Sequence, residues 1–312
     1  MADRWLVTGA LGCIGAWTIK TLLDDGEEVV GYDLGDDPAR LRLIVPSEDL
    51  PRVTLDQGDI TDLAALERVL DVHEITGVVH LAALQVPFCR ADPMLGARVN
   101  VVGTVNVFEA VKRRRDRIPG VAWASSAAVY SPDDPTPAPE SGGVRPETHY
   151  GVYKLANEGT ARIYWADDGI ASIGLRLYVV YGPGRDQGMT STPTQAMAAA
   201  ARGEDFEITY GGVAQYDYAP DVARAFVLAA RAVRDGAAVY NFPGVVAPME
   251  DVVAAIEAAA PAVRGMITWV DRPLAFPESM EAVGLERTVG PVPRTTLTDG
   301  VRETIEHLSA SS

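Results

Sequence analysis

Short apolar runs alternate with amphipathic segments along the first 180 residues of the chain. Runs of strand length lie at residues 4–8, 28–32, 53–56, 77–81, 121–125 and 171–180. Segments with helical periodicity separate them, among them residues 62–70 and 93–113. Strands that alternate with helices form a parallel sheet, because each helix returns the chain to the end of the sheet from which it started. We therefore predict an α/β fold whose centre is a doubly wound parallel sheet.

The pattern changes after residue 184, and a smaller lobe is predicted from there. Its expected elements are a helix at 194–202, a strand at 207–210 and helices at 249–260 and 297–308. We predict a first domain of residues 1–175, completed by parts of 205–243, and a second lobe of residues 176–204 and 244–312. The proline-rich stretch 131–146 is predicted to be a surface loop.

The composition argues against several classes of function. A net charge of −16 repels phosphate backbones, so we expect no nucleic-acid partner. The longest apolar stretches fall short of the ~20 residues that span a bilayer, and the N-terminus does not resemble a signal peptide. We therefore expect no membrane association and a cytoplasmic location. The two cysteines are expected to be free thiols, and four scattered histidines without a cysteine or histidine cluster argue against a metal site.

A glycine-rich turn links the first predicted strand to the first predicted helix. Gly9, Gly12 and Gly15 follow one another at a spacing of three, which lets peptide N–H groups and a helix N-terminus approach a pyrophosphate. Asp33 closes the second strand, where a carboxylate can accept both ribose hydroxyls of an adenosine and would repel a 2'-phosphate. We therefore predict a Rossmann-type domain that binds NAD rather than NADP. A tight turn followed by a loop aspartate is the alternative.

Two further segments fit the same cofactor. Asp59, at the end of the third strand, can reach the adenine amino group, although a helix N-cap is an alternative role for it. Leu81, Ala82 and Ala83 follow the fourth strand, where small residues let the backbone pass close to a cofactor. Packing alone would also explain these small residues.

Tyr150 and Lys154 are four residues apart in a predicted helix and share one face of it, about 6 Å apart. A cation at that distance favours phenolate, so we expect the pKa of Tyr150 to fall from about 10 towards neutrality. Such a tyrosine can take a proton from an alcohol and return it. The spacing alone is a weak signal of catalysis.

Six motifs together resemble the extended short-chain dehydrogenase/reductase family, in its NAD-dependent epimerase/dehydratase branch. They are TGALGCIG at 8–15, HLAA at 80–83, NVVGT at 100–104, SSAAVY at 125–130, YGVYK at 150–154 and LRLYVVYGPG at 175–184. The resemblance covers most of residues 4–230 and is far more specific than any one motif.

The resemblance implies catalytic and cofactor-binding roles. Ser126 would hydrogen-bond the reacting oxygen, Tyr150 would be the acid/base, and Lys154 would hold the nicotinamide ribose. Asn100 would lie near the cofactor, or cap its own helix, and Tyr178 would lie beside the nicotinamide ring, or belong to the core. The full set predicted to bind the cofactor is Gly9, Gly12, Cys13, Ile14, Gly15, Asp33, Asp59, Ile60, Leu81, Ala82, Ala83, Asn100, Tyr150, Lys154 and Tyr178.

Departures from the family's motifs bear on the reaction. Family members that dehydrate nucleotide sugars share an Asp-Glu pair directly after the catalytic Ser/Thr. This chain has Ala127 and Ala128 at those positions. Dehydration is therefore disfavoured. Nucleotide-sugar enzymes of the family commonly have an asparagine where Val179 stands and an arginine near 213–218, where this chain has none. Without these partners a diphosphate loses charge-assisted bonds, so the substrate need not carry a nucleotide.

Four further residues are predicted to contact the substrate. Gln85 follows the fourth-strand crevice, and Arg185, Thr190 and Ser191 belong to a loop whose polar groups suit a polyol or a sugar acid, although an exposed hydrophilic loop is equally compatible. Arg185 is a candidate partner for a carboxylate or phosphate.

The predicted function is NAD-dependent oxidation of a secondary alcohol of a sugar-like substrate. Re-reduction on the other face would give epimerisation, and release of the ketone would make the enzyme a net dehydrogenase, or ketoreductase, of a small sugar, sugar acid or other hydroxy compound. A catalytically silent NAD-binding sensor or scaffold is the alternative of another class. The resemblance also implies a homodimer, formed through the helix that bears Tyr150 and the helix at 93–113. Arg176 is expected to pair with an acid for structural reasons.

Overall fold

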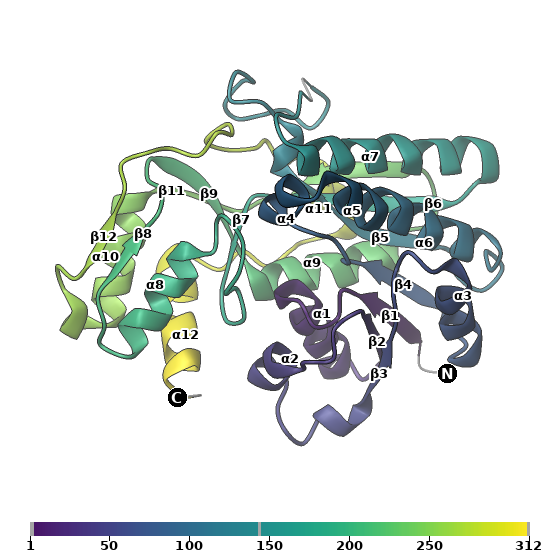
Figure 1. Ribbon diagram of the computed structural model, residues 1–312, viewed down its shortest axis with the longest axis horizontal. Coiled ribbons are helices and arrows are strands. Elements are labelled where there is room, and N and C mark those ends of the chain that lie inside the picture. The colour runs from purple at the N-terminus through teal and green to yellow at the C-terminus, as the bar shows by residue number, and fades with distance from the viewer. Residues whose placement is uncertain (1–2, 143–144, 311–312) are drawn as a thin grey trace.

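The computed structural model describes residues 3–142 and 145–310, and a seven-stranded sheet forms its centre (Figure 1). The strands of this sheet are β1 (Arg4–Thr8), β2 (Glu28–Asp33), β3 (Val53–Gln57), β4 (Gly77–His80), β5 (Gly120–Ser126), β6 (Ala171–Leu177) and β10 (Ala237–Asn241). Their order is β10-β6-β5-β4-β1-β2-β3, and all neighbours pair in parallel. The chain winds in opposite directions from β1, which confirms the doubly wound sheet and leaves a crevice at the carboxyl ends of β1 and β4.

Helices cover both faces of this sheet (Figure 1). On one face lie α3 (Leu63–Val72), α6 (Gly103–Lys112) and α7 (His149–Asp168), with α4 (Val86–Ala91) and α5 (Pro93–Ala97) packed beside α7. On the other face lie α1 (Cys13–Asp24), α2 (Ala39–Ile44), α9 (Ala219–Ala232) and α11 (Leu285–Val289). One apolar core fills each interface, with Phe108 and Trp123 in the first and Ile19 and Phe226 in the second. In the described part of the chain, no helix is long and apolar enough to cross a bilayer.

A second group of elements lies beside the carboxyl end of the sheet (Figure 1). Its strands are β7 (Val179–Tyr181), β9 (Val213–Tyr218) and β11 (Val245–Pro248), which form one sheet, and β8 (Phe206–Ile208) and β12 (Ile267–Trp269), which form another. Its helices are α8 (Thr192–Ala201), α10 (Met249–Ala259) and α12 (Leu297–Ala310). They share a core of their own, which contains Tyr181, Tyr216 and Met249.

The run at 171–180, predicted as one strand, is two strands in different sheets. β6 ends at Leu177 and β7 begins at Val179, where the chain leaves the large sheet to pair with β9. The N–H of Tyr178, between them, donates to a carboxylate oxygen of buried Asp217 at 2.6 Å. A partner 39 residues away therefore ends the strand, and the continuous apolar run gives no sign of it.

The helix predicted at 93–113 is interrupted. α5 and α6 are joined by η2 (Arg98–Val102), a π-helical turn that contains Asn100. The carbonyl of Asn100 accepts hydrogen bonds from the Thr104 hydroxyl at 2.7 Å and from the Asn157 amide at 2.9 Å. Side chains therefore compete with the helical backbone for this carbonyl, and π-turns of this kind are frequent at functional sites.

The proline-rich stretch 131–146 is not wholly a surface loop. Residues 143 and 144 lie outside the described residues, and the described part contains no helix or long strand. Ala138 is fully buried, and its N–H and carbonyl bond Ser279 and Glu281, both at 2.8 Å. The C-terminal segment therefore covers the middle of this stretch, a contact that local composition cannot predict.

Candidate active site

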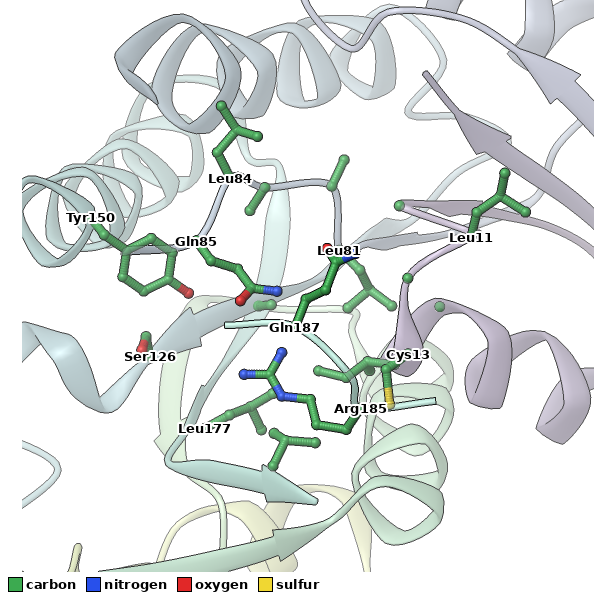
Figure 2. Close-up of a pocket in the computed structure, with 18 of the residues that line it drawn as sticks. Leu11, Cys13, Leu81, Leu84, Gln85, Ser126, Tyr150, Leu177, Arg185 and Gln187 are labelled. Atoms are coloured by element: carbon green, nitrogen blue, oxygen red, sulfur yellow. The ribbon is translucent and has the colours of Figure 1, made fainter. Parts of the chain in front are cut away.

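A cleft of about 680 Å³ lies at the carboxyl ends of the central strands, within the roughly 300–1,000 Å³ usual for small-molecule sites. Among the predicted residues, the following line it: Gly9, Gly12, Cys13, Ile14, Gly15, Asp33, Asp59, Ile60, Leu81, Ala82, Ala83, Gln85, Ser126, Tyr150, Lys154, Tyr178, Arg185 and Thr190. Leu11 and Cys13 of the glycine turn lie towards one end of it, and Ser126 and Tyr150 towards the other (Figure 2).

The glycine turn allows backbone segments to approach more closely than any side chain would permit. A Cβ on Gly9, whose φ is 71°, would lie 2.7 Å from the amide nitrogen of Ala82. A Cβ on Gly15 would lie 2.1 Å from the carbonyl oxygen of Gly9. Helix α1 begins at Cys13, so its unpaired N–H groups open into the cleft, where they can bind an anion such as a pyrophosphate.

Carboxylates line the part of the cleft next to β2 and β3. Asp33 accepts hydrogen bonds from the N–H of Leu11 at 2.9 Å and of Gly35 at 3.0 Å, so the glycine turn fixes its orientation. Asp59 accepts from Thr61 N–H at 2.8 Å, and the N-cap of α3 is Asp62 instead. The proposed alternative role of Asp59 as a helix cap is therefore not the observed one.

A buried hydrogen-bond network supports the loop after β4. The Leu81 and Ala82 N–H groups both donate to the Thr8 hydroxyl at 3.2 Å, and this hydroxyl in turn contacts Nδ1 of His80 at 2.7 Å. Nε2 of His80 lies 3.1 Å from the Thr104 hydroxyl, whose own proton goes to a carbonyl. Nε2 is therefore the donor and Nδ1 the acceptor of a neutral imidazole. Burial lowers the pKa of His80 to about 3, which keeps this ring neutral.

The start of α7 packs directly on the end of β5. The Thr148 side chain caps the helix by accepting the Gly151 N–H at 3.0 Å. A Cβ on Gly151 would lie 2.0 Å from the carbonyl oxygen of Ala128, so only glycine permits this contact. The close approach brings Tyr150 to the residue that ends β5, Ser126.

Ser126, Tyr150 and Lys154 come together at this end of the cleft. The phenol of Tyr150 points towards the hydroxyl of Ser126 (Figure 2). Nζ of Lys154 lies 5.6 Å from the centre of the Tyr150 ring and donates to the carbonyl of Ala124 at 2.7 Å. Since an ammonium has three protons and this is its one hydrogen bond to the described residues, it can also donate to a ligand.

The expected fall in the pKa of Tyr150 is not what the structure shows. Burial raises the pKa of the Tyr150 phenol above its ordinary value, and the Ser126 hydroxyl and the Arg185 charge oppose this effect without overcoming it. Burial also lowers the pKa of Lys154 to about 8. The prediction from spacing omitted desolvation, which disfavours the charged form of both groups.

A buried ion pair supports the end of β5 from behind. Arg176 donates to both carboxylate oxygens of Glu158, at 2.8 and 2.7 Å, and the Ser125 hydroxyl donates to the same carboxylate at 2.6 Å. The guanidinium also bonds the Tyr130 hydroxyl and the carbonyl of Glu140. The prediction that Arg176 pairs with an acid is confirmed.

Two predicted site residues do not line the cleft. Asn100 is buried, and its amide bonds the N–H and the carbonyl of Leu84 at 2.7 and 2.9 Å, so it holds the loop after β4 instead of facing a cofactor. Ser191 is also buried, and its hydroxyl donates to the carbonyl of Gly188 at 2.8 Å. The polar side-chain atoms of both residues are bonded to other parts of the protein and do not face the cleft.

Tyr178 does line the cleft, and its hydroxyl donates to the carbonyl of Pro277 at 2.6 Å.

Several lining residues were not predicted. Arg40 of α2 pairs with Asp186 at 2.8 Å, and Leu274 and Phe276 reach the cleft from the C-terminal segment. Phe276 packs edge-on against the ring of Tyr178, with ring centres 6.0 Å apart. Because Arg40 follows Asp33 by only seven residues in the chain, its place beside the cleft could have been predicted from the sequence. No nearby motif indicates that Leu274 or Phe276 lines the cleft.

Comparisons with known proteins agree with this geometry. The sequence matches the model of the NAD dependent epimerase/dehydratase family over residues 5–242. UDP-glucuronate 4-epimerase 1 of Arabidopsis thaliana is 33% identical over 183 residues, which are 57% of this chain and 42% of that protein. The chain therefore matches less than half the length of this relative. UDP-glucose 4-epimerase of Azospirillum brasilense is 30% identical over 252 residues, which are 75% of this chain and 70% of that protein.

Similarity to solved structures extends over the whole chain. The crystal structure of a Thermus thermophilus UDP-glucose 4-epimerase in complex with NAD superposes with a TM-score of 0.82 at 27% identity. The superposition covers 99% of this chain and 100% of that chain. The family match includes the glycine turn, Ser126, Tyr150 and Lys154, and the structural match also includes the smaller lobe.

Proposed function

Because this chain belongs to the NAD dependent epimerase/dehydratase family, whose cofactor is NAD, we propose that it oxidises a secondary alcohol of a sugar-like substrate. The observation that carries the proposal is the meeting of Ser126, Tyr150 and Lys154 in the cleft that also contains the glycine turn and Asp33. We further propose that the domain built on the large sheet binds NAD and that the smaller lobe contributes substrate contacts.

The residues around the glycine turn suit the phosphate and adenosine parts of the cofactor. The N-terminus of α1, with Gly12 and Gly15, can bind the pyrophosphate, because its N–H groups have no helical partner. Asp33 can accept the ribose hydroxyls, and Asp59, which also lines the cleft, would bond the adenine. NAD supplies the hydride acceptor.

Tyr150 would act as the base that takes the hydroxyl proton, and Ser126 would orient the alcohol oxygen. Lys154 would donate to the ribose hydroxyls of the cofactor and stabilise the phenolate. Since burial raises the pKa of Tyr150, we expect the phenolate fraction, and the rate of oxidation with it, to rise with pH. A rate that is flat or falls between neutral and alkaline pH would contradict this role.

The outcome of the reaction is either epimerisation or net oxidation. The relatives named above are epimerases of UDP-sugars, which supports epimerisation. Ala127 and Ala128 after the serine argue against dehydration. Val179, and the absence of arginine from residues 213–218, remove two partners for a diphosphate and support a small substrate without a nucleotide.

A panel of sugars, sugar acids and nucleotide sugars tests the proposal. Accumulation of NADH absorbance would indicate a dehydrogenase, and isomer formation without net NADH would indicate an epimerase. Tyr150→Phe should abolish turnover of the active substrate and leave NAD affinity unchanged. Turnover that survives in this variant would remove Tyr150 from the mechanism, and inertness towards the whole panel with NAD bound would favour a silent NAD-binding protein.

We also propose that two copies of the chain associate through α4, α5 and α7. These helices lie side by side (Figure 1). They expose the apolar residues Phe88, Met94, Leu95, Val152 and Ile163. Met94 is 76% exposed, and several exposed apolar side chains on adjoining helices are typical of a protein–protein contact. The family resemblance implies a homodimer through α7 and residues 93–113, and a second copy placed there would bury these side chains.

A further inference from the structure

Arg185 is a cation in the cleft that no acid of the described residues neutralises. Its Nε is buried and has no hydrogen-bond partner, and the side chain's one hydrogen bond to the described residues runs from Nη2 to the Thr190 hydroxyl at 3.4 Å. The adjacent carboxylate, Asp186, is engaged by Arg40 at 2.8 Å. Most donors of the Arg185 guanidinium are therefore unused.

The side chain of Arg185 extends towards the catalytic end of the cleft. Figure 2 shows its guanidinium between Leu177 and Gln85, on the side that faces Ser126 and Tyr150, while its backbone lies near Cys13. A Cβ on Gly188 would lie 2.0 Å from Oε1 of Gln85 and 3.1 Å from Nη2 of Arg185, so these two groups lie close together.

The side-chain amide of Gln85 at this end also lacks a partner among the described residues. Gln85 is the N-cap residue of α4, but its side chain makes no capping bond, and its amide bonds none of the described residues. A guanidinium, an amide and the Thr190 hydroxyl therefore converge on one space. A buried donor without an acceptor, such as Nε of Arg185, is unfavourable, so this group is suited to a ligand that brings acceptor oxygens.

The charges of the lining residues are unevenly distributed. Asp33, Asp36, Asp37 and Asp59 line the part of the cleft next to β2 and β3. The guanidinium of Arg185 and the ammonium of Lys154 lie towards the other end, and neither forms an ion pair with the described residues. The chain as a whole carries a charge of −16 and repels anions from a distance. Near Arg185 a planar guanidinium can bind a carboxylate with two parallel hydrogen bonds, so an anionic group is favoured there.

We infer that Arg185, with Gln85 and Thr190, binds a carboxylate of the substrate, which makes the substrate a hydroxy acid such as a sugar acid. This inference rests on the proposed function, because it assumes that the alcohol reacts at Tyr150. The carboxylate would fix which hydroxyl of the substrate faces Tyr150, and Arg185 is thus a specificity-determining residue.

A phosphate of the cofactor is the other anion that could reach this guanidinium. The side chain leads away from Cys13, in the glycine turn, towards Ser126, which favours the substrate (Figure 2). The experiment therefore measures NAD affinity and substrate preference separately.

The test compares matched pairs that differ in a carboxylate: D-gluconate with D-glucitol, D-glucuronate with D-glucose, and UDP-glucuronate with UDP-glucose. Turnover is measured for the wild type, Arg185→Gln, Arg185→Lys and the control Arg42→Gln, which removes the same charge from an exposed position of α2. NAD affinity is measured for each by titration of protein fluorescence.

The wild type should turn over the acid of a pair faster than its neutral partner. Arg185→Gln should lower kcat/KM for the acid by about 10–100-fold, the loss expected for a charge-assisted contact. The neutral partner should lose less than the acid, since the Arg185 charge also opposes the rise in the pKa of Tyr150 and its removal slows both substrates. NAD affinity should be unaffected, Arg185→Lys should be intermediate, and Arg42→Gln should match the wild type.

Three other results would overturn the inference. Equal loss for both members of a pair would mean that Arg185 does not recognise the carboxylate, and the proposed oxidation would stand. Loss of NAD affinity with an unchanged ratio of acid to neutral turnover would assign Arg185 to the cofactor. Inertness of every substrate with NAD bound would refute the proposed function and, with it, the inference.

Discussion

The buried pair of Glu158 and Arg176 offers a quantitative test of how the end of β5 is held in place. The two side chains are 9% and 6% exposed and lie 2.7 Å apart. Replacing Glu158 by methionine would leave the guanidinium in the interior without a counter-charge. Removal of one partner of a buried pair costs about 3–5 kcal/mol, because the remaining charge stays desolvated. We expect Glu158→Met to lower the free energy of unfolding by this amount.

The double variant separates charge from packing. Arg176→Met together with Glu158→Met removes both charges and replaces them by apolar side chains, so its loss should be smaller than the sum of the two single losses. Asp24→Asn is the control, since the Lys20–Asp24 pair on α1 is 26% and 49% exposed. Breaking such a pair on a helix surface should cost less than about 1 kcal/mol.

Urea unfolding, followed by circular dichroism, measures all four variants against the wild type. The reasoning is refuted if Glu158→Met costs less than about 1 kcal/mol, since a buried guanidinium would then tolerate the loss of its partner. It is also refuted if the two single losses add up in the double variant, because the charges would then not interact.

Three further predictions concern the cofactor, pH and assembly. Gly15→Ala should weaken NAD binding by at least about tenfold, because its Cβ would lie 2.1 Å from the Gly9 carbonyl oxygen. The control Gly159→Ala, at a position with open space around it, should bind NAD like the wild type in the same fluorescence titration. Burial raises the pKa of Asp217 to about 7, so its contribution to stability falls as pH rises from about 4 to 7. The free energy of unfolding of Asp217→Asn, relative to that of the wild type, should therefore rise over this pH range by at most about 1.4 kcal/mol per pH unit. A difference in urea unfolding that does not change with pH would contradict this. Val152→Asp, on the exposed face of α7, should convert a dimer to a monomer in light scattering; a monomeric wild type would refute the proposed interface.

Features that depend on neighbouring residues could be predicted from the sequence. The alternation of strand and helix patterns gave the doubly wound sheet, because periodicity reports which face of each element is buried. The spacing of Gly9, Gly12 and Gly15 marked the turn that lines the cleft, and the i, i+4 spacing placed Tyr150 and Lys154 on one helix face. Each of these features depends on residues that are close together in the sequence, so the local pattern is enough to predict it.

The tertiary structure decided what depends on distant partners and on burial. Asp217 ends β6 at Tyr178 from 39 residues away, and Phe276 enters the cleft from the C-terminal segment. The side-chain amide of Asn100 holds the loop after β4 and does not face a cofactor, because both its oxygen and its nitrogen are bonded to the backbone of Leu84. The sequence determined which chemical groups stand near Tyr150, but the pKa of that phenol rises because the folded protein removes it from water. Desolvation is a property of the whole surrounding structure, so no local spacing encodes it.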